Sequence, residues 1–306
     1  MSINKTRAAE ILDAVQNCTL LVTGDLMLDR YILGSVDRIS PEAPVPVVHV
    51  QNERAVPGGA CNVALNVATL GAKARLVGCV GDDALAEVAM TLLRRDGVDV
   101  SNVMSELGTA TGVALIAVSP DGENQITVAS GANSRVGPSD VAGLPKCDVI
   151  LSQLEVPVTA VEAATRRAAE TGALMAINLA PAIGVSPQLL KDADLLIVNE
   201  IEAAFYGDAL HERGGLVALT LGGDGAALFK MGQEIARVPA FKVDVVDTTG
   251  AGDTFCGALA VALAEGQPPE QALRFASAAA ALAVTRPGAQ PSLPKRAQVD
   301  AMLGEA

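Results

Sequence analysis

Short apolar runs alternate with helical patterns along most of this chain of 306 residues. The short runs are bounded by Gly or Asp and are rich in β-branched residues, which is typical of buried strands. Between them, apolar residues recur at the spacing of one helix face. Because alternating strands and helices are the pattern of βαβ units, the sequence predicts an α/β fold with a mostly parallel central sheet.

The clearest predicted elements follow one another without an internal repeat or a low-complexity linker. We expect strands at 19–23, 74–79, 149–152, 174–177, 195–198, 216–221 and 241–246. We expect helices at 62–70, 84–95, 159–171, 200–206, 254–263 and 276–283.

Two stretches interrupt this alternation: 31–56, with prolines at 41, 44 and 46, and 111–129, which has strand-like periodicity around Asp121-Gly122. We interpret them as strands that leave the main sheet and form a small β lid, spanning about 30–57 and 111–129, over a ligand cleft. The whole chain, 1–306, would then be one domain. Proline-rich segments are also compatible with plain loops.

Composition narrows the possible partners. The formal net charge of −13 repels phosphate backbones and anionic lipid, and aromatic residues make up 2% of the chain with no Trp. We therefore expect no nucleic-acid partner and no membrane partner, and any purine must be held between aliphatic walls. The longest apolar stretches are much shorter than a membrane span.

Cysteine usage indicates the compartment. The five cysteines are scattered, form no CxxC motif and lie in apolar surroundings, so we expect them to be reduced residues of a cytoplasmic protein. Residues 1–15 have the charge mix of an amphipathic helix and lack the pattern of a signal peptide.

The strongest local motif is 247–255, DTTGAGDTF, between the predicted strand 241–246 and the predicted helix 254–263. Small residues where a helix begins leave backbone N–H groups free for a phosphoryl group, and the helix dipole adds positive potential. Asp253 would lie beside this anion site, where a carboxylate can accept a hydroxyl proton. Alternatively, Asp253 caps the helix and the glycines only make a tight turn. Because the chain has no Gly-x4-Gly-Lys-Ser/Thr motif, a P-loop enzyme is excluded.

Two weaker motifs follow predicted strands. In 220–226, TLGGDGA, the glycines would let the backbone approach a nucleotide, although a hairpin turn explains them equally. Asn199 and Glu202 follow the strand 195–198, at the edge where open α/β sheets bind ligands, and could contact phosphate oxygens and the hydration shell of Mg²⁺. Acidic residues at a helix start are also ordinary partners of the helix dipole.

Near the N-terminus, Asp29 follows the first strand, and Gly58, Gly59 and Asn62 open the next helix. Carboxylate and amide side chains beside bare backbone N–H groups suit a polyol, whose hydroxyls need both donors and acceptors. The alternatives are that Asp29 is a solvated turn residue and that the two glycines only start the helix. We expect Asn66, Cys61 and Cys256 to be structural.

In their order and spacing, these motifs resemble the ribokinase-like (PfkB) carbohydrate kinases over nearly the whole chain. The resemblance implies a three-layer α/β/α fold and ATP-dependent transfer of the γ-phosphoryl group to a sugar hydroxyl. It implies Asp253 as general base, an anion hole at Gly250, Ala251 and Gly252, and a homodimer formed through the lid strands. By the same resemblance, the nucleotide and its Mg²⁺ are bound by Asn199, Glu202, Thr220, Gly222, Gly225 and Ser277.

The segment 284–292, VTRPGAQPS, resembles the ribokinases of this family, in which this loop and the residues before the anion hole bind a monovalent cation. The segment 153–155, QLE, is also similar and implies that Glu155 contacts the sugar, together with Asp29, Gly58, Gly59 and Asn62. The positions that match the potassium site are Asp247, Thr249, Ala283, Arg286, Gly288 and Ser292.

The N-terminal quarter instead resembles the heptose-7-phosphate kinases, on the segments 24–31 and 38–48. Ribokinases usually carry GGKGAN where this chain has 58–62, GGACN, and Asn where it has Met27. The heptose kinases' middle motif with Asp-Tyr and Lys-Gly is not found here. We therefore rank phosphorylation of ribose first, of heptose 7-phosphate second and of a nucleoside third. A non-catalytic sugar or nucleotide sensor is the hypothesis from another class.

Overall fold

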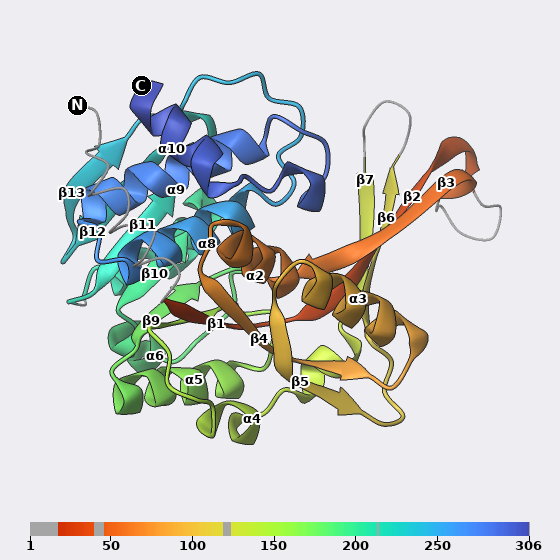
Figure 1. Cartoon of the computed structure of the whole chain (residues 1–306), viewed down its shortest axis with the longest axis horizontal. Coiled ribbons are helices and arrows are strands. Elements are labelled where there is room, and N and C mark those ends of the chain that lie inside the picture. Colours follow the sequence, from red (N-terminus) through yellow and green to blue (C-terminus); the bar gives the residue numbers. More distant parts are fainter. Residues whose placement is uncertain (1–17, 40–45, 119–123, 213, 306) are drawn as a thin grey trace.

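The computed structural model describes residues 18–39, 46–118, 124–212 and 214–305. The predicted amphipathic stretch 1–15, together with Pro41 and Pro44, lies outside them. Within the described residues, a sheet of nine strands has helices on both of its faces (Figure 1). The three-layer α/β/α prediction is confirmed.

The strands of this main sheet run in one direction except Ala226–Lys230 near one edge, which is antiparallel to both of its neighbours. The strands predicted before residue 221 are confirmed, with ends within two residues of those expected. Across the sheet the order is β13 (Gln233–Val238), β12 (Ala226–Lys230), β11 (Leu216–Thr220), β10 (Leu195–Val198), β9 (Leu174–Asn178), β8 (Val149–Ser152), β1 (Thr19–Thr23), β4 (Lys73–Gly81) and β5 (Asp99–Glu106).

Alternate side chains of the strands point to two separate cores. On β1, Leu20 and Val22 join the core on one face, whereas Leu21 joins the core on the other, as the two-residue period of a strand requires. The first face is covered by α2 (Ala60–Thr69), α3 (Ala84–Arg95), α8 (Ala251–Ala264), α9 (Pro269–Ala283) and α10 (Arg296–Glu305). The second is covered by α4 (Pro138–Ala142), α5 (Val158–Thr171), α6 (Pro187–Asp192) and α7 (Glu200–Tyr206).

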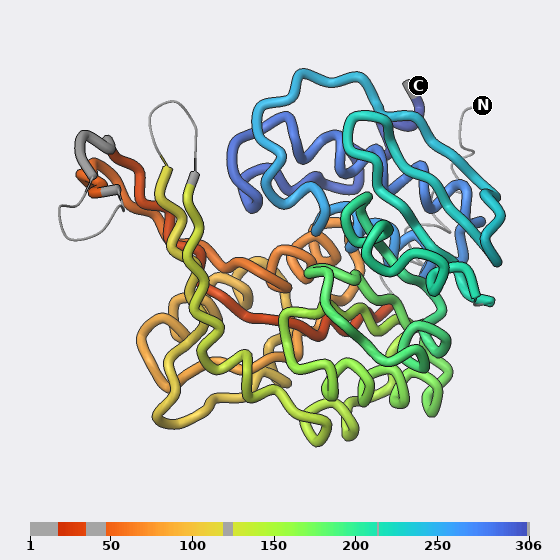
Figure 2. The backbone as a smooth tube through the Cα atoms, turned by 180° about the vertical axis from the view of Figure 1, so that it is seen from behind, coloured from red at the N-terminus to blue at the C-terminus, as the bar shows by residue number. Residues whose placement is uncertain are grey.

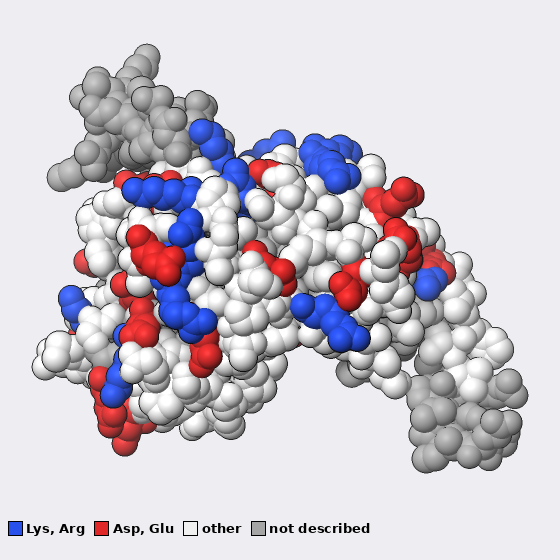
Figure 3. Space-filling model, turned by 90° about the horizontal axis from the view of Figure 1, so that it is seen from below, with Lys and Arg blue, Asp and Glu red and all other residues white. Residues whose placement is uncertain are grey.

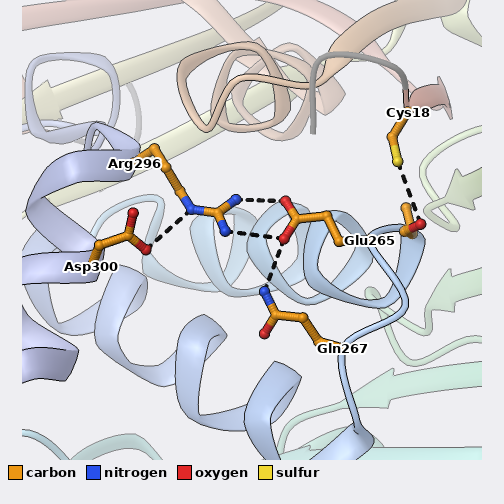
Figure 4. Close-up of polar contacts among 6 residues, drawn as sticks. Cys18, Glu265, Gln267, Arg296 and Asp300 are labelled. Carbon is orange, nitrogen blue, oxygen red and sulfur yellow. Dashed lines mark hydrogen bonds and ion pairs between the residues drawn. The ribbon is translucent and has the colours of Figure 1, made fainter. Parts of the chain in front are cut away.

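The C-terminal helix α10 is fixed to this body by Arg296 (Figure 4). Its guanidinium donates to both carboxylate oxygens of Glu265, just after α8, at 2.5 and 3.0 Å, and to Asp300 at 3.2 Å. The Glu265 side chain is only 2% exposed, so this ion pair is shielded from solvent and has the bidentate geometry that favours Arg. Cys18 donates to the carbonyl of Ala264 at 3.4 Å, which joins the start of β1 to the same helix end.

A second, four-stranded sheet projects from one side of the body (Figures 1 and 2). Its order is β3 (Pro46–Gly59), β2 (Leu26–Ile39), β6 (Gly112–Val118), β7 (Asn124–Ala129). The β2–β3 and β6–β7 pairs are antiparallel, and β2–β6 is parallel. The prediction that these segments are strands leaving the main sheet is confirmed, and the plain-loop alternative is wrong for their described residues.

The strand predicted at 241–246 is wrong. This segment passes the edge strand β13 without pairing with any strand of the described chain, and Val245 and Val246 are 64% and 59% exposed. The N–H groups of Val246 and Asp247 instead donate to the carbonyl of Val284, at 2.8 and 3.2 Å. The β-branched run therefore forms an extended connection, held against the loop after α9, that leads directly into α8.

Charged side chains of both signs share the face seen in Figure 3, with uncharged surface between them. Ion pairs in the described chain include Arg75 with Asp99 at 2.9 Å and Arg30 with Glu53. No helix in the described part of the chain is long and apolar enough to cross a membrane.

Candidate active site

The loops that follow neighbouring strands of the main sheet converge on one cavity of about 380 Å³. Because the carboxyl ends of parallel strands meet at one edge of a sheet, residues distant in the sequence become neighbours there. Predicted site residues from five segments line it together. The lining includes Gly59, Glu155, Asn199, Glu202, Thr220, Gly250, Gly252 and Asp253.

Asp253 lies in the first turn of α8, and its carboxylate points into the cavity. The Asn62 amide donates to Oδ2 at 3.2 Å, and the Gln153 amide donates to Oδ1 at 3.4 Å. Gly250, with φ of 76°, is the N-cap of α8, and Asp253 makes no capping hydrogen bond. The capping alternative is therefore wrong, and the carboxylate is oriented by two side chains from other elements.

The pKa of Asp253 is raised to about 7. Burial is the largest cause, and the hydrogen bond from Asn62 opposes it; the nearby negative charges of Glu155 and Asp29 raise the pKa further, and the hydrogen bond from Gln153 lowers it. A carboxylate with this pKa can both take up a proton and release it near neutral pH, which is the requirement for a general base.

The start of α8 also provides backbone N–H groups. The first N–H groups of a helix have no intrahelical acceptor, so they attract an anion. A side chain added at Gly252 would meet no atom within 4 Å and would extend into open space, whereas one at Gly250 would come within 2.7 Å of Ala289. Gly252 thus leaves the approach to these amides open, and Gly250 is required for packing and for its positive φ.

The cavity of about 380 Å³ is the polar half of the cleft; the predicted residues Asp29, Gly58 and Asn62 do not line it but lie next to its lining residues Gly59 and Asp253. Asp29 is partly buried on β2 and packs against Gly58, where an added Cβ would lie 2.0 Å from its Oδ1. Burial, followed by the charge of Glu155, raises the pKa of Asp29 to about 6. Asp29 is therefore part of a closely packed wall, and the alternative of a solvated turn residue is wrong.

Asn199 and Glu202 serve two purposes. Asn199 is the N-cap of α7, and its side chain accepts from the N–H groups of Ile201 and Glu202 at 2.8 and 3.0 Å. Glu202 in turn accepts from the Asn199 backbone N–H at 2.7 Å and from its side-chain amide at 3.0 Å. Both residues thus cap α7, which agrees with the alternative that they stabilise the helix start, and both still line the cavity, Glu202 with only 6% exposure.

A second cavity, of about 300 Å³, joins the first at Thr220 and Gly252. The predicted residues Gly222, Gly225 and Ser277 line it, and its walls are otherwise mainly aliphatic. The turn Gly222–Asp224 connects the antiparallel strands β11 and β12, so the hairpin interpretation is also correct. Gly225 has φ of 99°, and an added Cβ would lie 2.1 Å from the carbonyl of Val238. The prediction of purely aliphatic walls for a flat ring is only partly correct, because Phe241 and Phe255 also line this cavity.

The loop predicted to bind potassium folds around Asp247. Its Oδ1 accepts from the backbone and hydroxyl of Thr249 at 2.9 and 2.7 Å, and its Oδ2 accepts from the Gly288 N–H at 2.7 Å. Burial raises its pKa, but these hydrogen bonds outweigh burial and lower it. Ser292 donates to the carbonyl of Ala289 at 2.7 Å, while Ala283 is buried at the end of α9 and Arg286 is exposed.

Three cavity residues were not predicted from the sequence: Asp25 beneath the cavity, and Gln153 and Asn178 in its wall. Each lies at or just after the carboxyl end of a main-sheet strand, so the rule that selected Asn199 could have found them.

Most of the buried polar side-chain atoms without a partner in the described chain belong to this region. Four of these atoms are Asp25 Oδ2, Asn62 Oδ1, Gln153 Oε1 and Ser277 Oγ. The other two are Asn66 Oδ1, one helical turn after Asn62, and Tyr31 Oη, two residues after Asp29.

The residues expected to be structural are buried as predicted. All five cysteines are unpaired and buried, including Cys61 and Cys256 beside the cleft. Asn66 is fully buried and donates to the carbonyl of Asn62 at 2.9 Å, which supports the turn that orients Asn62.

Residues 19–296 match the pfkB family of carbohydrate kinases. The chain is 38% identical to the Schizosaccharomyces pombe ribokinase over 269 residues, covering 79% of this chain and 85% of that protein. It is 36% identical to the bifunctional protein HldE of Azorhizobium caulinodans, covering 91% of this chain and 63% of that protein. The Arabidopsis thaliana ribokinase, solved in complex with ribose and ATP, superposes with a TM-score of 0.83 at 28% identity, covering 94% of this chain and 98% of that chain.

The chain therefore belongs to the pfkB family of carbohydrate kinases. It is an ATP-dependent sugar kinase of the ribokinase-like fold. The enzyme prediction is confirmed, and the hypothesis of a non-catalytic sensor loses its support.

Proposed function

We propose that this kinase phosphorylates D-ribose on a hydroxyl group, with Asp253 as the general base. The observation that carries this proposal is the position of Asp253 where the two cavities join, at the N-terminus of a helix, with a pKa of about 7 and two side chains orienting its carboxylate. A sugar hydroxyl placed against this carboxylate would face a phosphoryl group placed at the helix N-terminus.

In the proposed complex, the sugar lies in the polar half of the cleft. Asp29 and Glu155 accept hydrogen bonds from its hydroxyls, and the Gly58-Gly59 backbone and Asn62 complete the set of donors and acceptors. Asp253 removes the proton of the attacking sugar hydroxyl as the hydroxyl oxygen bonds to the γ-phosphorus. The bond from phosphorus to the β-phosphate oxygen of ATP then breaks, and ADP leaves.

The anion hole at Gly250, Ala251 and Gly252 stabilises the negative charge on the γ-phosphoryl oxygens during transfer. The bare Gly252 backbone is what allows these oxygens to approach, since a side chain there would occupy the open space. Positioning and electrostatic stabilisation by fixed backbone N–H groups require no reorganisation during the reaction, which is why they suit phosphoryl transfer.

The apolar cavity would hold the adenine of ATP. Thr220, Gly222 and Gly225 bring backbone close to the nucleotide, and the unpartnered Ser277 hydroxyl offers one polar contact on the far wall. Since this wall consists mostly of aliphatic side chains together with Phe241 and Phe255, burial of the ring against apolar surface would supply most of the binding free energy.

Glu202 is the residue that suits Mg²⁺, through water. No group of three or more acidic, His or Cys side chains in the described chain forms a ready metal site, which fits an ion that arrives with the nucleotide and keeps several waters. The buried Glu202 carboxylate is fixed by Asn199 and faces the cavity, so it can accept hydrogen bonds from such waters. When bound, Mg²⁺ neutralises charge on the phosphates.

Ribose is the first candidate because the chain is similar to ribokinases over most of its length, including one solved with ribose and ATP. Heptose 7-phosphate is the second candidate, because the segments 24–31 and 38–48 resemble heptose-7-phosphate kinases and because the chain is also similar to HldE. A nucleoside is the third.

The test is ADP release from ATP with Mg²⁺ and K⁺ across ribose, fructose, heptose 7-phosphate and adenosine. We expect the highest kcat/KM with ribose. A response confined to heptose 7-phosphate would mean that the N-terminal segment determines the substrate, and a response confined to adenosine would replace the sugar by a nucleoside. Turnover of none of the four would contradict the substrate assignment.

Three further properties belong to this proposal. K⁺ would bind at the loop around Asp247 and Gly288. The protein would act in the reducing cytoplasm, which suits its five buried thiols.

The second sheet would act as the lid of the sugar cleft and pair with its counterpart in a homodimer. Exposed apolar side chains on that sheet, at Val50, Ile126 and Val128, support such a contact, and light scattering coupled to size exclusion would measure it.

A further inference from the structure

Beneath the sugar half of the cleft lies Asp25, a carboxylate that the proposed reaction does not use. It follows β1, is fully buried with 0% exposure, and forms no ion pair with Lys or Arg in the described chain. A buried charge without a partner is strongly unfavourable, so a side chain in this position is normally neutral or has a specific function.

One of its oxygens fixes the start of α2. The Ala60 N–H donates to the Asp25 carbonyl at 2.9 Å and to Oδ1 at 3.2 Å. The N-cap of α2 is Gly59, which has no side chain to cap the helix, and φ of 59° and ψ of −136° at Gly59 suit only glycine. Asp25 therefore supplies, from the connection between β1 and β2, an acceptor that helix starts usually obtain from their own N-cap residue.

The other oxygen lies directly behind Gly59. A Cβ added to Gly59 would be 1.9 Å from Asp25 Oδ2, and this oxygen has no hydrogen-bond partner in the described chain. Gly59 in turn lines the cavity next to Gly58, which packs against Asp29 in the same manner. The two consecutive glycines of the sugar wall are thus each backed by one carboxylate.

The charges facing Asp25 are all negative or neutral. Glu155 approaches from the loop after β8, Asp253 from α8, and the Cys61 thiol from α2. Burial first, and then the charge of Glu155, raises the pKa of Asp25 well above its ordinary value. A neutral Asp25 adds no further negative charge to a cleft that needs Asp253 ionised.

We propose that Asp25 is a positioning residue of the sugar site: its carboxyl group holds the Gly59-Ala60 turn and thereby the wall against which the sugar binds. This inference rests on the sugar site proposed above. It does not place Asp25 in contact with the substrate or the reacting atoms.

Two substitutions separate the shape of Asp25 from its charge. Asp25→Asn keeps an acceptor for the Ala60 N–H and is always neutral. Because this hydrogen bond between neutral groups is retained, we expect the KM of the variant for sugar at neutral pH to stay within about threefold of that of the parent. Asp25→Ala removes the side-chain acceptor and the atoms behind Gly59, and it leaves the Ala60 N–H only its bond to the backbone carbonyl of residue 25. We expect KM for sugar to rise roughly tenfold, the effect of losing one buried hydrogen bond, with KM for ATP nearly unchanged.

The pH dependence provides a second readout. As pH rises and Asp25 loses its proton, the parent should lose affinity for sugar, because the new charge is buried near Glu155 and Asp253. Asp25→Asn should show no such alkaline loss. Burial raises the pKa of the Cys61 thiol well above its ordinary value as well, so the comparison with Asp25→Asn at each pH identifies the loss that is due to Asp25.

Asp148→Ala is the matched control, because Asp148 also accepts a backbone N–H, that of Thr19 at 2.8 Å, but at the opposite end of β1. We expect both KM values to stay unchanged in this variant. The proposal is overturned if Asp25→Asn is as impaired as Asp25→Ala at neutral pH, or if Asp25→Ala raises both KM values equally or neither.

Hydrogen–deuterium exchange of the free protein separates this inference from the substrate assignment. Asp25→Ala should speed exchange in the peptide that contains Ala60, and Asp25→Asn and Asp148→Ala should not. If the parent phosphorylates no sugar but this exchange pattern holds, the proposed function fails and the structural role of Asp25 stands. If exchange at Ala60 is unchanged in Asp25→Ala, the positioning role itself is refuted.

Discussion

The two halves of the cleft meet at Thr220 and Gly252 but are lined by different kinds of residue. The sugar half presents carboxylates and amides, and it contains the buried groups with raised pKa values, Asp253 and Asp29. The nucleotide half presents glycines, aliphatic side chains and the phenylalanines Phe241 and Phe255, with Ser277 as a buried polar group.

This difference separates the means by which each half can be disturbed. A polar wall acts through charge, hydrogen bonds and proton affinity, so an isosteric substitution that alters one atom is enough to change its chemistry. An apolar wall acts through its shape, so only a change of volume matters. Substitutions in the two halves should therefore alter different kinetic constants.

The largest effect is expected at the junction of the two halves. Asp253→Asn keeps the shape of the side chain and removes its ability to take a proton, so kcat should fall by about 10²–10⁴-fold, the usual contribution of a general base. Both KM values should change little. Steady-state kinetics with ADP detection measure this.

Asp83→Asn is the control for that experiment, because Asp83 is also a carboxylate at a helix N-terminus, accepting from the Ala86 N–H at 2.9 Å on α3, but does not line the cleft. It should leave kcat unchanged. Turnover of Asp253→Asn close to that of the parent would show that another group accepts the proton.

The second largest effect tests the apolar half. Ala280 lines the nucleotide cavity from α9, and Ala280→Phe would fill much of its 300 Å³. We expect KM for ATP to rise roughly tenfold or more, as overpacking costs on the order of 1–3 kcal/mol, and KM for sugar to stay within twofold.

Gln271→Phe introduces the same ring on the exposed side of α9 and should have no effect on either constant. Equal increases of both KM values in Ala280→Phe would mean that the two halves are coupled and would break the comparison.

A smaller effect sharpens the polar half. Because Asp253 must be ionised to act as a base, kcat/KM should rise with pH through a midpoint of about 7. The Gln153 amide donates to Asp253 and favours its ionised form, so Gln153→Leu should move this midpoint to higher pH. A pH series of kcat/KM with one sugar measures the shift.

Gln267→Leu removes an amide that donates to Glu265, far along α8 from the cleft, and serves as the control with an unchanged midpoint.

The raised pKa of Asp253 also has a consequence for stability. Since the folded pKa of Asp253 lies above its unfolded value near 4, its stabilising contribution is complete at low pH and is lost as pH rises through about 7. In the pH series of kcat/KM, a midpoint that moves to lower pH in Gln153→Leu would contradict the role given to the Gln153 amide.

Much of the fold and many of the site positions were predictable, because both depend on local patterns. The strands 19–23, 149–152 and 195–198 were predicted with correct ends, since each is a short apolar run with clear boundaries. The failure at 241–246 has a physical reason. A β-branched run indicates an extended backbone, but whether it finds a partner strand depends on which edge of the sheet is nearby, and that is not a local property.

The site shows the same limit. The sequence identified Asp253 through its glycine-rich context but could not show that Asn62 and Gln153, 191 and 100 residues away, hold its carboxylate. It overlooked Asp25 because a carboxylate after a strand has no local signal for burial. The fact that Asp25 lies behind Gly59 comes from the register of β2 against β3, which pairs Leu26 with Gly59.

The smallest expected effect concerns the loop beside the nucleotide half. If K⁺ binds around Asp247, its role is to hold the segment that leads into the anion hole, so it should change activity without taking part in the chemistry. Replacing K⁺ by tetramethylammonium, which is too bulky for such a site, should lower kcat/KM by about fivefold, the low end of coupling between two sites.

Asp247→Ala should remove this dependence on K⁺, because the loop would lose the acceptor that joins Thr249 to Gly288. Asp244→Ala, three residues earlier on the exposed part of the same segment, should retain it. Equal kcat/KM of the parent in the two cations would refute the potassium site. Such a result would leave Asp247 as a purely structural link between the α8 N-terminus and the loop after α9, a role for which its three hydrogen bonds are already sufficient.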